Sequence, residues 1–290
     1  MAQPGDAGLV YACVTHVPLW VQYPSHVETI HLGDAQRDGV LNLRDLAPEW
    51  GPYHPLLGGT AGTFALKNHV LRHHPQATSI GICQYRKFVS RERIHRNVAQ
   101  GYRVMDMVPK DRLSPDLLTD VMRPREPFLL SKPFTLSNWR RHSDYLEQYA
   151  RVHRAMDLLR FSAEAVEQGV IDNDGATRFL GEDMFMVGGV ELGVFPADFW
   201  LPTVTAIESV VRECIRRYQP APEGYQLRAW AFCTERLGSF LLLEHLRAMD
   251  GREFRVGRLA WAAPSHWTRR FVGQLNLITV EGATNYVIGR

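Results

Sequence analysis

The sequence predicts an α/β protein in which helices flank a mixed, mostly parallel central sheet. Short β-branched segments and an amphipathic segment follow one another along residues 9–83, in the order strand, strand, helix, strand. The 290 residues are 45% hydrophobic and 22% charged, a composition typical of globular chains with a substantial core. We therefore expect a single domain over residues 1–290.

The first part of the chain supplies strands and one helix of this sheet. Runs of β-branched and other apolar residues predict strands over 9–17, 27–32 and 78–83. Phe64 and Val70 belong to an apolar pattern with helical spacing that predicts a helix over 61–74. The Gly-rich stretch 58–62 lacks the spacing of a nucleotide-binding loop, so we expect a tight turn into this helix.

The second part of the chain is predicted to be mainly helical. A long amphipathic helix is expected from Ser137, a good N-cap residue, to near Gly169. A short buried strand over 184–187 is closed by two glycines. The remaining predicted elements are two helices over 203–218 and 230–249 and strand-like alternation over 271–280.

Charge and cysteine usage narrow the class of protein. Thirty-three basic and 31 acidic residues give a net charge of +2, too balanced for a protein that mainly grips nucleic acid. The four cysteines are scattered singly, which fits a reducing cytoplasm. No basic residue precedes Arg37, so we expect no secretion signal. Apolar runs are too short to cross a membrane, although peripheral membrane contact is compatible with the sequence.

A basic segment over Arg86–Arg103 follows the predicted strand 78–83 directly. It holds six basic residues and one acid. Ligands of open α/β sheets bind beyond the carboxyl ends of strands, so these cations suit a phosphate or diphosphate. A solvated basic loop explains the same composition equally well. Thr15 and His16 end the first strand and are placed for a nucleotide contact, or for a purely local role in the loop.

Carboxylates and one histidine are candidates for acid–base chemistry. Tyr149, His153 and Asp157 are four residues apart, which predicts one helix face carrying either an acid–base pair or a surface pair. Glu182 and Asp183 precede the short strand 184–187, where an acid could act as a general base or close a turn.

An Asp-x-Asp spacing at Asp172 and Asp174 is the spacing that binds a divalent cation in sugar-nucleotide enzymes. Gly175 follows it directly, and for that reason we favour a turn. We therefore expect no resident cofactor, and a divalent cation is not favoured.

Several short motifs occur in an order that resembles a known family. The motifs are Thr15-His16, Thr60-Ala61, Lys67-Asn68, Ile80 to Phe88, Tyr149 with His153 and Asp157-Leu158, Asp183-Met184-Phe185, and Glu235-Arg236-Leu237. Together they resemble a family of bacterial polysaccharide-biosynthesis proteins that includes galactofuranosyltransferases. The chain departs from the family pattern at four places, with Gln84 for His, Lys87 for Arg, Gly58-Gly59 for Glu-Leu and Asp183 for Asn.

The resemblance implies a glycosyltransferase with a GT-A-like fold that uses a nucleotide-sugar, with a UDP-sugar as the expected donor. It further implies a saccharide or lipid-linked saccharide acceptor, a cytoplasmic location that extends to the inner face of the membrane, and no nucleic-acid partner. Residues of about 1–135 would form the nucleotide-binding half and those of about 136–290 the acceptor half. The donor-binding residues that the resemblance suggests are Thr15, His16, Asn68, Gln84, Tyr85, Arg86 and Lys87.

Asp183 is our first choice for the base that deprotonates the acceptor, and His153 with Asp157 is the second. We expect Asp183 and Arg86 to face the same pocket. Glu235 and Arg236 suit either a buried ion pair or substrate contact. The competing function is non-catalytic binding of nucleic acid or an anionic membrane, through Arg86–Arg103 and the basic, Trp-containing segment 261–270.

Overall fold

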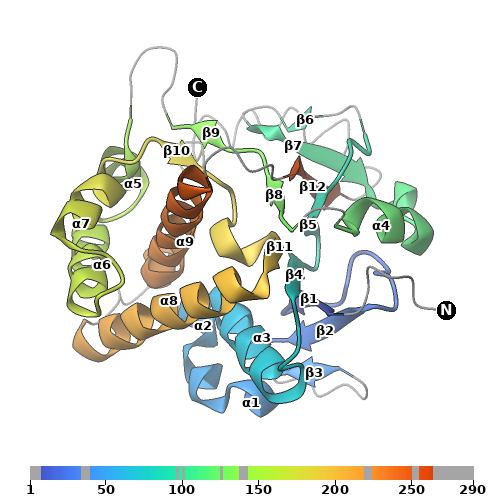
Figure 1. Cartoon of the computed structure of the whole chain (residues 1–290), viewed down its shortest axis with the longest axis horizontal. Coiled ribbons are helices and arrows are strands. Elements are labelled where there is room, and N and C mark those ends of the chain that lie inside the picture. The colour runs from blue at the N-terminus through green and yellow to red at the C-terminus, as the bar shows by residue number, and fades with distance from the viewer. Residues whose placement is uncertain are drawn as a thin grey trace.

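The structure is a computed structural model that describes residues 8–33, 40–95, 98–99, 102–124, 127–136, 143–218, 224–249 and 255–263. Helices pack around a large sheet, which confirms the predicted mixed α/β class (Figure 1). Among the described residues, no helix is both long enough and apolar enough to span a membrane.

The N-terminal strands form the parallel part of the sheet. They are β1 (Leu9–Thr15), β2 (Val27–His31), β3 (Leu41–Asn42) and β4 (Ser79–Gln84), in the order β3-β2-β1-β4. These four strands pair with one another in parallel, and β1 lies between β2 and β4. The strands predicted over 9–17, 27–32 and 78–83 are confirmed.

Beyond β4 the sheet closes on itself. The strands involved are β5 (Lys87–Ser90), β8 (Leu129–Ser131), β11 (Gly193–Pro196) and β12 (Arg255–Ala263). β4 pairs with β11, β11 with β8, β8 with β12, β12 with β5, and β5 with β4 again. This ring of five strands is a small closed barrel, and most of its pairings are antiparallel. The prediction of a mostly parallel sheet is therefore wrong outside the N-terminal strands.

Further strands extend or flank this barrel. β7 (Tyr102–Pro109) pairs with β12, and β6 (Val98–Ala99) pairs with β7. A separate two-stranded sheet joins β9 (Phe134–Thr135) and β10 (Met184–Phe185), where a strand was predicted. The predicted strand over 271–280 lies outside the described residues.

Helices cover the sheet on both faces. The α-helices are α1 (Leu43–Leu46), α2 (His54–Leu57), α3 (Gly59–His73), α4 (Pro115–Met122), α5 (Tyr145–Val152), α6 (Ala155–Glu167), α7 (Asn173–Leu180), α8 (Ala197–Arg217) and α9 (Ala229–Ala248). The 3₁₀ helices are η1 (Pro48–Tyr53), η2 (Lys110–Arg112), η3 (Gly189–Glu191) and η4 (Tyr225–Arg228). Helices α5, α6 and α7 lie together on the side of α9 away from the sheet (Figure 1).

The predicted helix from Ser137 to Gly169 is interrupted. Residues 137–142 lie outside the described residues, and α5 and α6 are separated at His153, whose backbone is extended. The helix expected over 203–218 begins earlier, at Ala197, while α3 and α9 lie where helices were predicted. A helix begins at Gly59 directly after Gly58, which has a φ of 52°, so the turn predicted for the Gly-rich stretch is confirmed.

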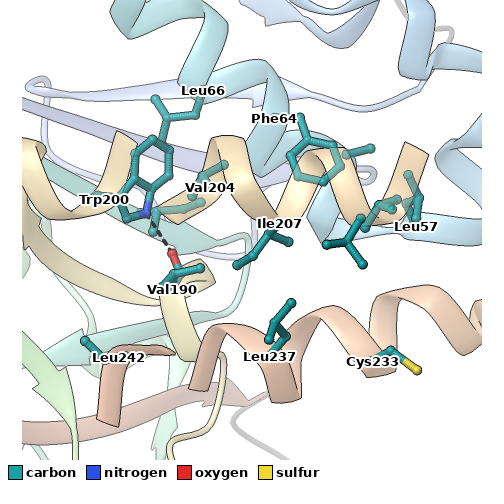
Figure 2. Close-up of a cluster of buried hydrophobic side chains, with 14 of the residues drawn as sticks. Leu57, Phe64, Leu66, Val190, Trp200, Val204, Ile207, Cys233, Leu237 and Leu242 are labelled. Atoms are coloured by element: carbon teal, nitrogen blue, oxygen red, sulfur yellow. Dashed lines mark hydrogen bonds between the residues drawn. The ribbon is translucent and has the colours of Figure 1, made fainter. Parts of the chain in front are cut away.

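The main core lies between the sheet and helices α3, α8 and α9. Alternating residues of β1 divide between two buried clusters, because successive strand side chains point to opposite faces. Figure 2 shows Phe64 of α3, Ile207 of α8 and Leu237 of α9 packed in this core. The Trp200 indole N–H donates to the carbonyl of Val190 at 2.9 Å, which fixes η3 against the core (Figure 2).

Candidate functional site

The candidate site lies at the carboxyl ends of β1 and β4. The chain leaves β1 toward β2 and β3 and later returns to β4 on the other side of β1, so the strand order reverses between β1 and β4. This is where ligands of open α/β sheets bind. Thr15 and His16 end β1, while Gln84 pairs with Lys87 across a tight turn made of Tyr85 and Arg86. The structure thus brings these predicted donor-binding residues together.

Thr15 shapes the turn after β1. Its hydroxyl accepts a hydrogen bond from the backbone N–H of Val17 at 3.2 Å, and its carbonyl accepts one from Leu32 at 2.8 Å. Thr15 itself is buried and His16 is exposed. The threonine therefore acts on the site through the backbone that presents His16.

Aromatic rings surround the Arg86 guanidinium. Its central carbon lies 5.6 Å from the ring centre of Trp20, 5.1 Å from that of Tyr85 and 4.9 Å from that of Trp261. Tyr85 also makes edge contacts with the rings of Trp20 and His16. Cation–π contacts hold a guanidinium in position without neutralising it. The arrangement fixes a positive charge at the carboxyl end of β4.

The pKa values of His16 and His54, two histidines near these strand ends, are lowered. Burial, together with the charges of Arg228, Arg86 and His31, lowers the pKa of His16 from its usual value. Burial and the same neighbourhood of His16, Arg228 and His31 lower the pKa of His54. Neutral imidazoles can both donate and accept hydrogen bonds, so His16 and His54 add polar but uncharged groups beside the cations.

Two acids face Lys87. Glu191 is 8% exposed and accepts a hydrogen bond from the Thr60 hydroxyl at 2.6 Å. Burial raises the pKa of Glu191 to about 8, with a further upward contribution from Glu235, against the downward effects of Thr60 and Lys87. Glu191 is therefore mostly protonated at neutral pH. Burial also lowers the pKa of Lys87, although Glu235 and Glu191 oppose that shift.

Glycines place these acids. Gly188 and Gly189 have φ values of 83° and 50°, and the Gly188 N–H donates to Glu235 at 2.9 Å. A Cβ on Gly189 would lie 2.7 Å from the backbone nitrogen of Ser239 in α9. The two glycines therefore allow η3 to pack directly on α9, and this contact brings Glu191 toward Glu235.

Sequence reasoning missed several residues of this site. They are Trp20, His31, His54, Glu191 and Arg228, none of which belongs to a motif. Trp20 could have been considered because it lies in the loop that follows β1. His31 could also have been considered, because it ends β2, the parallel neighbour of β1. The other three come from elements distant in the sequence, and only the tertiary structure brings them near His16 or Lys87.

Asn68 does not belong to this site. Its side chain donates to the carbonyl of Leu46 at 3.0 Å and joins α3 to α1. Gly59, at the other end of α3, is the helix residue that approaches Gln84. Nine residues of helix, about 13 Å, separate Gly59 from Asn68. The structure therefore places Asn68 away from the strand ends, and its donor contact stays a prediction.

The structure also separates Asp183 from Arg86 and Lys87. Residues 182–188 run along α9, because Gly188 bonds to Glu235 while Glu182 forms an ion pair with Arg247 at 2.6 Å. Glu235 and Arg247 are twelve helical residues apart, or about 18 Å. Asp183 is therefore beside the far end of α9. The expectation that it faces the same pocket as Arg86 is wrong, and Glu182 belongs to an ion pair.

His153 and Asp157 lie on the opposite side of α9, beside α5 and α6. The His153 ring stacks on Phe232 with ring centres 4.4 Å apart, and burial, followed by the charge of Arg236, lowers its pKa to about 4. Burial raises the pKa of Asp157, although Arg154 and Arg160 oppose the shift. The helix is interrupted at His153, yet the ring centres of Tyr149 and His153 are 4.5 Å apart, so these two predicted neighbours lie together. Their surroundings combine aromatic rings with the charges of Arg154, Arg160 and Arg236.

Glu235 and Arg236 do not form the ion pair considered from the sequence. Glu235 bonds to the Gly188 N–H, while Arg236 donates to the carbonyl of Phe232 at 2.8 Å and to the side chain of Gln148. Adjacent helical residues point about 100° apart, which explains the divergence. Glu235 lies at the candidate site and Arg236 lies among α5 and α9.

Other polar motifs have local partners. Asp172 caps α7 by accepting from the Gly175 N–H at 2.6 Å, in agreement with the turn favoured from the sequence. β5 runs antiparallel to β4 and leads the basic segment away from Arg86. Arg91 donates to Asp120 at 3.0 Å, and Arg93 lies 3.6 Å from Asp106. Among the described basic residues of Arg86–Arg103, Arg91 and Arg93 thus already face acids of this chain. This argues against the alternative in which the basic segment binds nucleic acid.

Comparisons with known proteins support the fold. No protein-family model matches the chain, and no curated protein matches its sequence. The chain is similar to the solved apo structure of WbbM, a bifunctional glycosyltransferase, with a TM-score of 0.67 over 88% of this chain and 13% identity. The match covers 45% of the WbbM chain, so this chain spans less than half of that protein. The fold is thus one that a glycosyltransferase also adopts.

Proposed function

We propose that this chain is a glycosyltransferase that moves a sugar from a nucleotide-sugar donor to a saccharide or lipid-linked saccharide acceptor in cell-surface polysaccharide synthesis. The main support for the proposal is the reversal of strand order between β1 and β4. The carboxyl ends of these two strands present His16, Tyr85, Arg86 and Lys87. The fold shared with a bifunctional glycosyltransferase supports this class of enzyme. The GT-A-like assignment follows from the family resemblance.

The cations have a defined task in this proposal. When the glycosidic bond to the donor breaks, negative charge grows on the leaving diphosphate and must be stabilised. Arg86, fixed by three rings, and Lys87 supply that charge at one strand end. His16 and Tyr85 provide hydrogen bonds and a ring edge for the nucleoside, with a UDP-sugar as the first donor to test. Fixed cations take the part that a divalent cation plays in other transferases.

Glu235 is the proposed base for the acceptor hydroxyl. Glu191 is mostly protonated at neutral pH and cannot accept a proton there, which leaves Glu235 for this role. Both acids come from the second half of the chain, as does Arg228. In this proposal the predicted donor half, about 1–135, and the predicted acceptor half, about 136–290, both contribute residues to one site.

Nucleotide binding tests the proposal. We expect UDP to bind the full chain, as measured by calorimetry, and Arg86→Gln to weaken that binding about 10-fold to 100-fold because charge-assisted contacts to phosphate are lost. Arg216→Gln is the control, since Arg216 is an exposed residue that pairs with Glu213 on α8. The affinity should be the same in EDTA as in Mg²⁺. Equal UDP affinity for wild type and Arg86→Gln would contradict the proposal.

A further inference from the structure

A second cluster of polar side chains lies at the amino ends of the parallel strands, opposite the candidate transfer site. Glu28 is near the start of β2, His69 is in the last turns of α3, and His74 caps the end of that helix. α3 begins beside the end of β4, so its last turn lies toward the starts of the strands. This cluster is separate from the candidate transfer site, because the 15 residues of α3 span about 22 Å.

Three electron-pair donors converge in this cluster. His69 Nε2 lies 2.8 Å from Glu28 Oε2 and 3.2 Å from His74 Nε2. His74 Nε2 is 3.9 Å from Glu28 Oε1. If His69 Nε2 carries a proton, it donates to Glu28 and has no lone pair left for His74. If it carries none, it faces the carboxylate as a second acceptor. Hydrogen bonds alone therefore cannot give all three side chains, Glu28, His69 and His74, a suitable partner.

We propose that Glu28, His69 and His74 bind a divalent transition-metal ion, with Zn²⁺ as the ion that fits best. Their ligand atoms all lie within 4.8 Å of one another. Two imidazole nitrogens bound to tetrahedral zinc at about 2.0 to 2.1 Å are about 3.3 Å apart, close to the separation of the two histidines here. Imidazole and carboxylate suit zinc, whereas Mg²⁺ and Ca²⁺ prefer oxygen ligands alone.

The surroundings suit a metal ion that keeps one side accessible to solvent. The His69 side chain is 7% exposed, while those of His74 and Glu28 are 37% and 39% exposed. One ligand is therefore held by the packed interior, and two border solvent, from which an ion can enter and a water can complete the coordination. The ion would join β2 to the end of α3. Its binding does not depend on the transferase proposal.

Metal titration of the full chain tests this site. After treatment with a chelator, we expect one Zn²⁺ per chain, a Kd of about 1 μM or tighter by competition with a chromogenic chelator, and a higher melting temperature. Mg²⁺ should leave the melting temperature unchanged. Bound Co²⁺ should show the visible absorption of a tetrahedral site with nitrogen and oxygen ligands.

Two variants locate the ion. Glu28→Gln and His74→Gln change partly exposed residues, and each should weaken Zn²⁺ binding by more than about 10-fold. His245→Gln also removes one exposed imidazole, on α9 outside the cluster, and should leave the affinity unchanged. Absence of stoichiometric binding, or equal affinity in wild type and both cluster variants, would overturn the proposal. Circular dichroism of each variant checks that it folds.

Discussion

At the scale of single residues, Glu191 and Lys87 lie close together and have opposite formal charges, yet burial dominates the pKa of both. Burial raises the pKa of Glu191 to about 8 and lowers that of Lys87. An acid with this pKa favours the protonated form at neutral pH. Burial therefore works against the charged form of both residues, and Glu191 is the one whose neutral form is favoured at neutral pH.

The raised pKa of Glu191 predicts a pH dependence of stability. Between its ordinary pKa of 4.5 and about 8, the folded protein binds a proton that the unfolded chain releases. The free energy of unfolding should therefore fall as pH rises through this window, by at most about 1.4 kcal/mol per pH unit. Glu191→Gln, which resembles the protonated acid, should remove this slope in urea unfolding measured from pH 5 to pH 8.5.

His153 supplies a control for that experiment, because its contribution to the free energy of unfolding changes with pH in the opposite direction. Its pKa is lowered to about 4 from 6.5, so between these values the unfolded chain binds a proton that the folded protein lacks. Stability attributable to His153 is lost as pH falls through this window, and His153→Gln should reduce that loss. A Glu191→Gln variant with the same pH slope as wild type above pH 6.5 would show that Glu191 is ionised in the folded protein.

At the scale of elements, the contact between η3 and α9 carries the acids of the candidate site. Gly189 has a φ of 50°, and a Cβ added there would lie 2.7 to 3.0 Å from backbone atoms of α9. From the sequence, the glycine pair was expected to close the short strand 184–187. The structure gives it a different role, since it permits two backbones to approach each other.

Gly189→Ala should lower the free energy of unfolding by about 2 to 4 kcal/mol, because backbone strain and a backbone clash act together. Gly169→Ala is the matched control. Gly169 has a φ of 68° but nothing within 4 Å of a built Cβ, so only the strain applies and the loss should be about 1 kcal/mol. Chemical denaturation measures both. Equal losses would mean that η3 shifts away from α9 at little cost.

At the scale of the whole molecule, barrel closure joins segments that are far apart in the sequence. β12 pairs with β5, β7 and β8, so residues 255–263 complete a ring begun by β4. A strand inside a closed ring has partners on both sides, whereas β3, among the strands that the structure describes, pairs only with β2. The parts of the fold should therefore differ in how they open.

Native-state hydrogen exchange with mass spectrometry tests this difference. Amides of β4, β11 and β12 should exchange together, through global unfolding, because the ring cannot open at one strand alone. Amides of β3 should exchange faster, since this strand has two residues and lies at an edge of the sheet. Exchange of β12 as fast as that of β3 would show that the barrel opens locally.

The sequence by itself determined the local elements and the candidate-site residues that follow β1 and β4. Periodicity located β1, β2, β4, α3 and α9, because apolar spacing of two or 3.6 residues is a local property. It also pointed to Thr15, His16, Arg86 and Lys87, because ligand-binding residues follow the ends of parallel strands. Such positions can be found from the sequence once the end of each strand is located. Gln84 and Tyr85 were suggested by the family resemblance.

Only the tertiary structure decided which distant residues join them. Glu191 and Arg228 reach the site through η3 and η4, while Asn68 and Asp183 lie elsewhere, at distances set by how α3 and α9 pack. Barrel closure depends on pairing β12 with strands more than 100 residues earlier, and the pKa of Glu191 depends on what buries it. Pairing and burial are properties of long-range contacts, which the pattern of neighbouring residues does not encode.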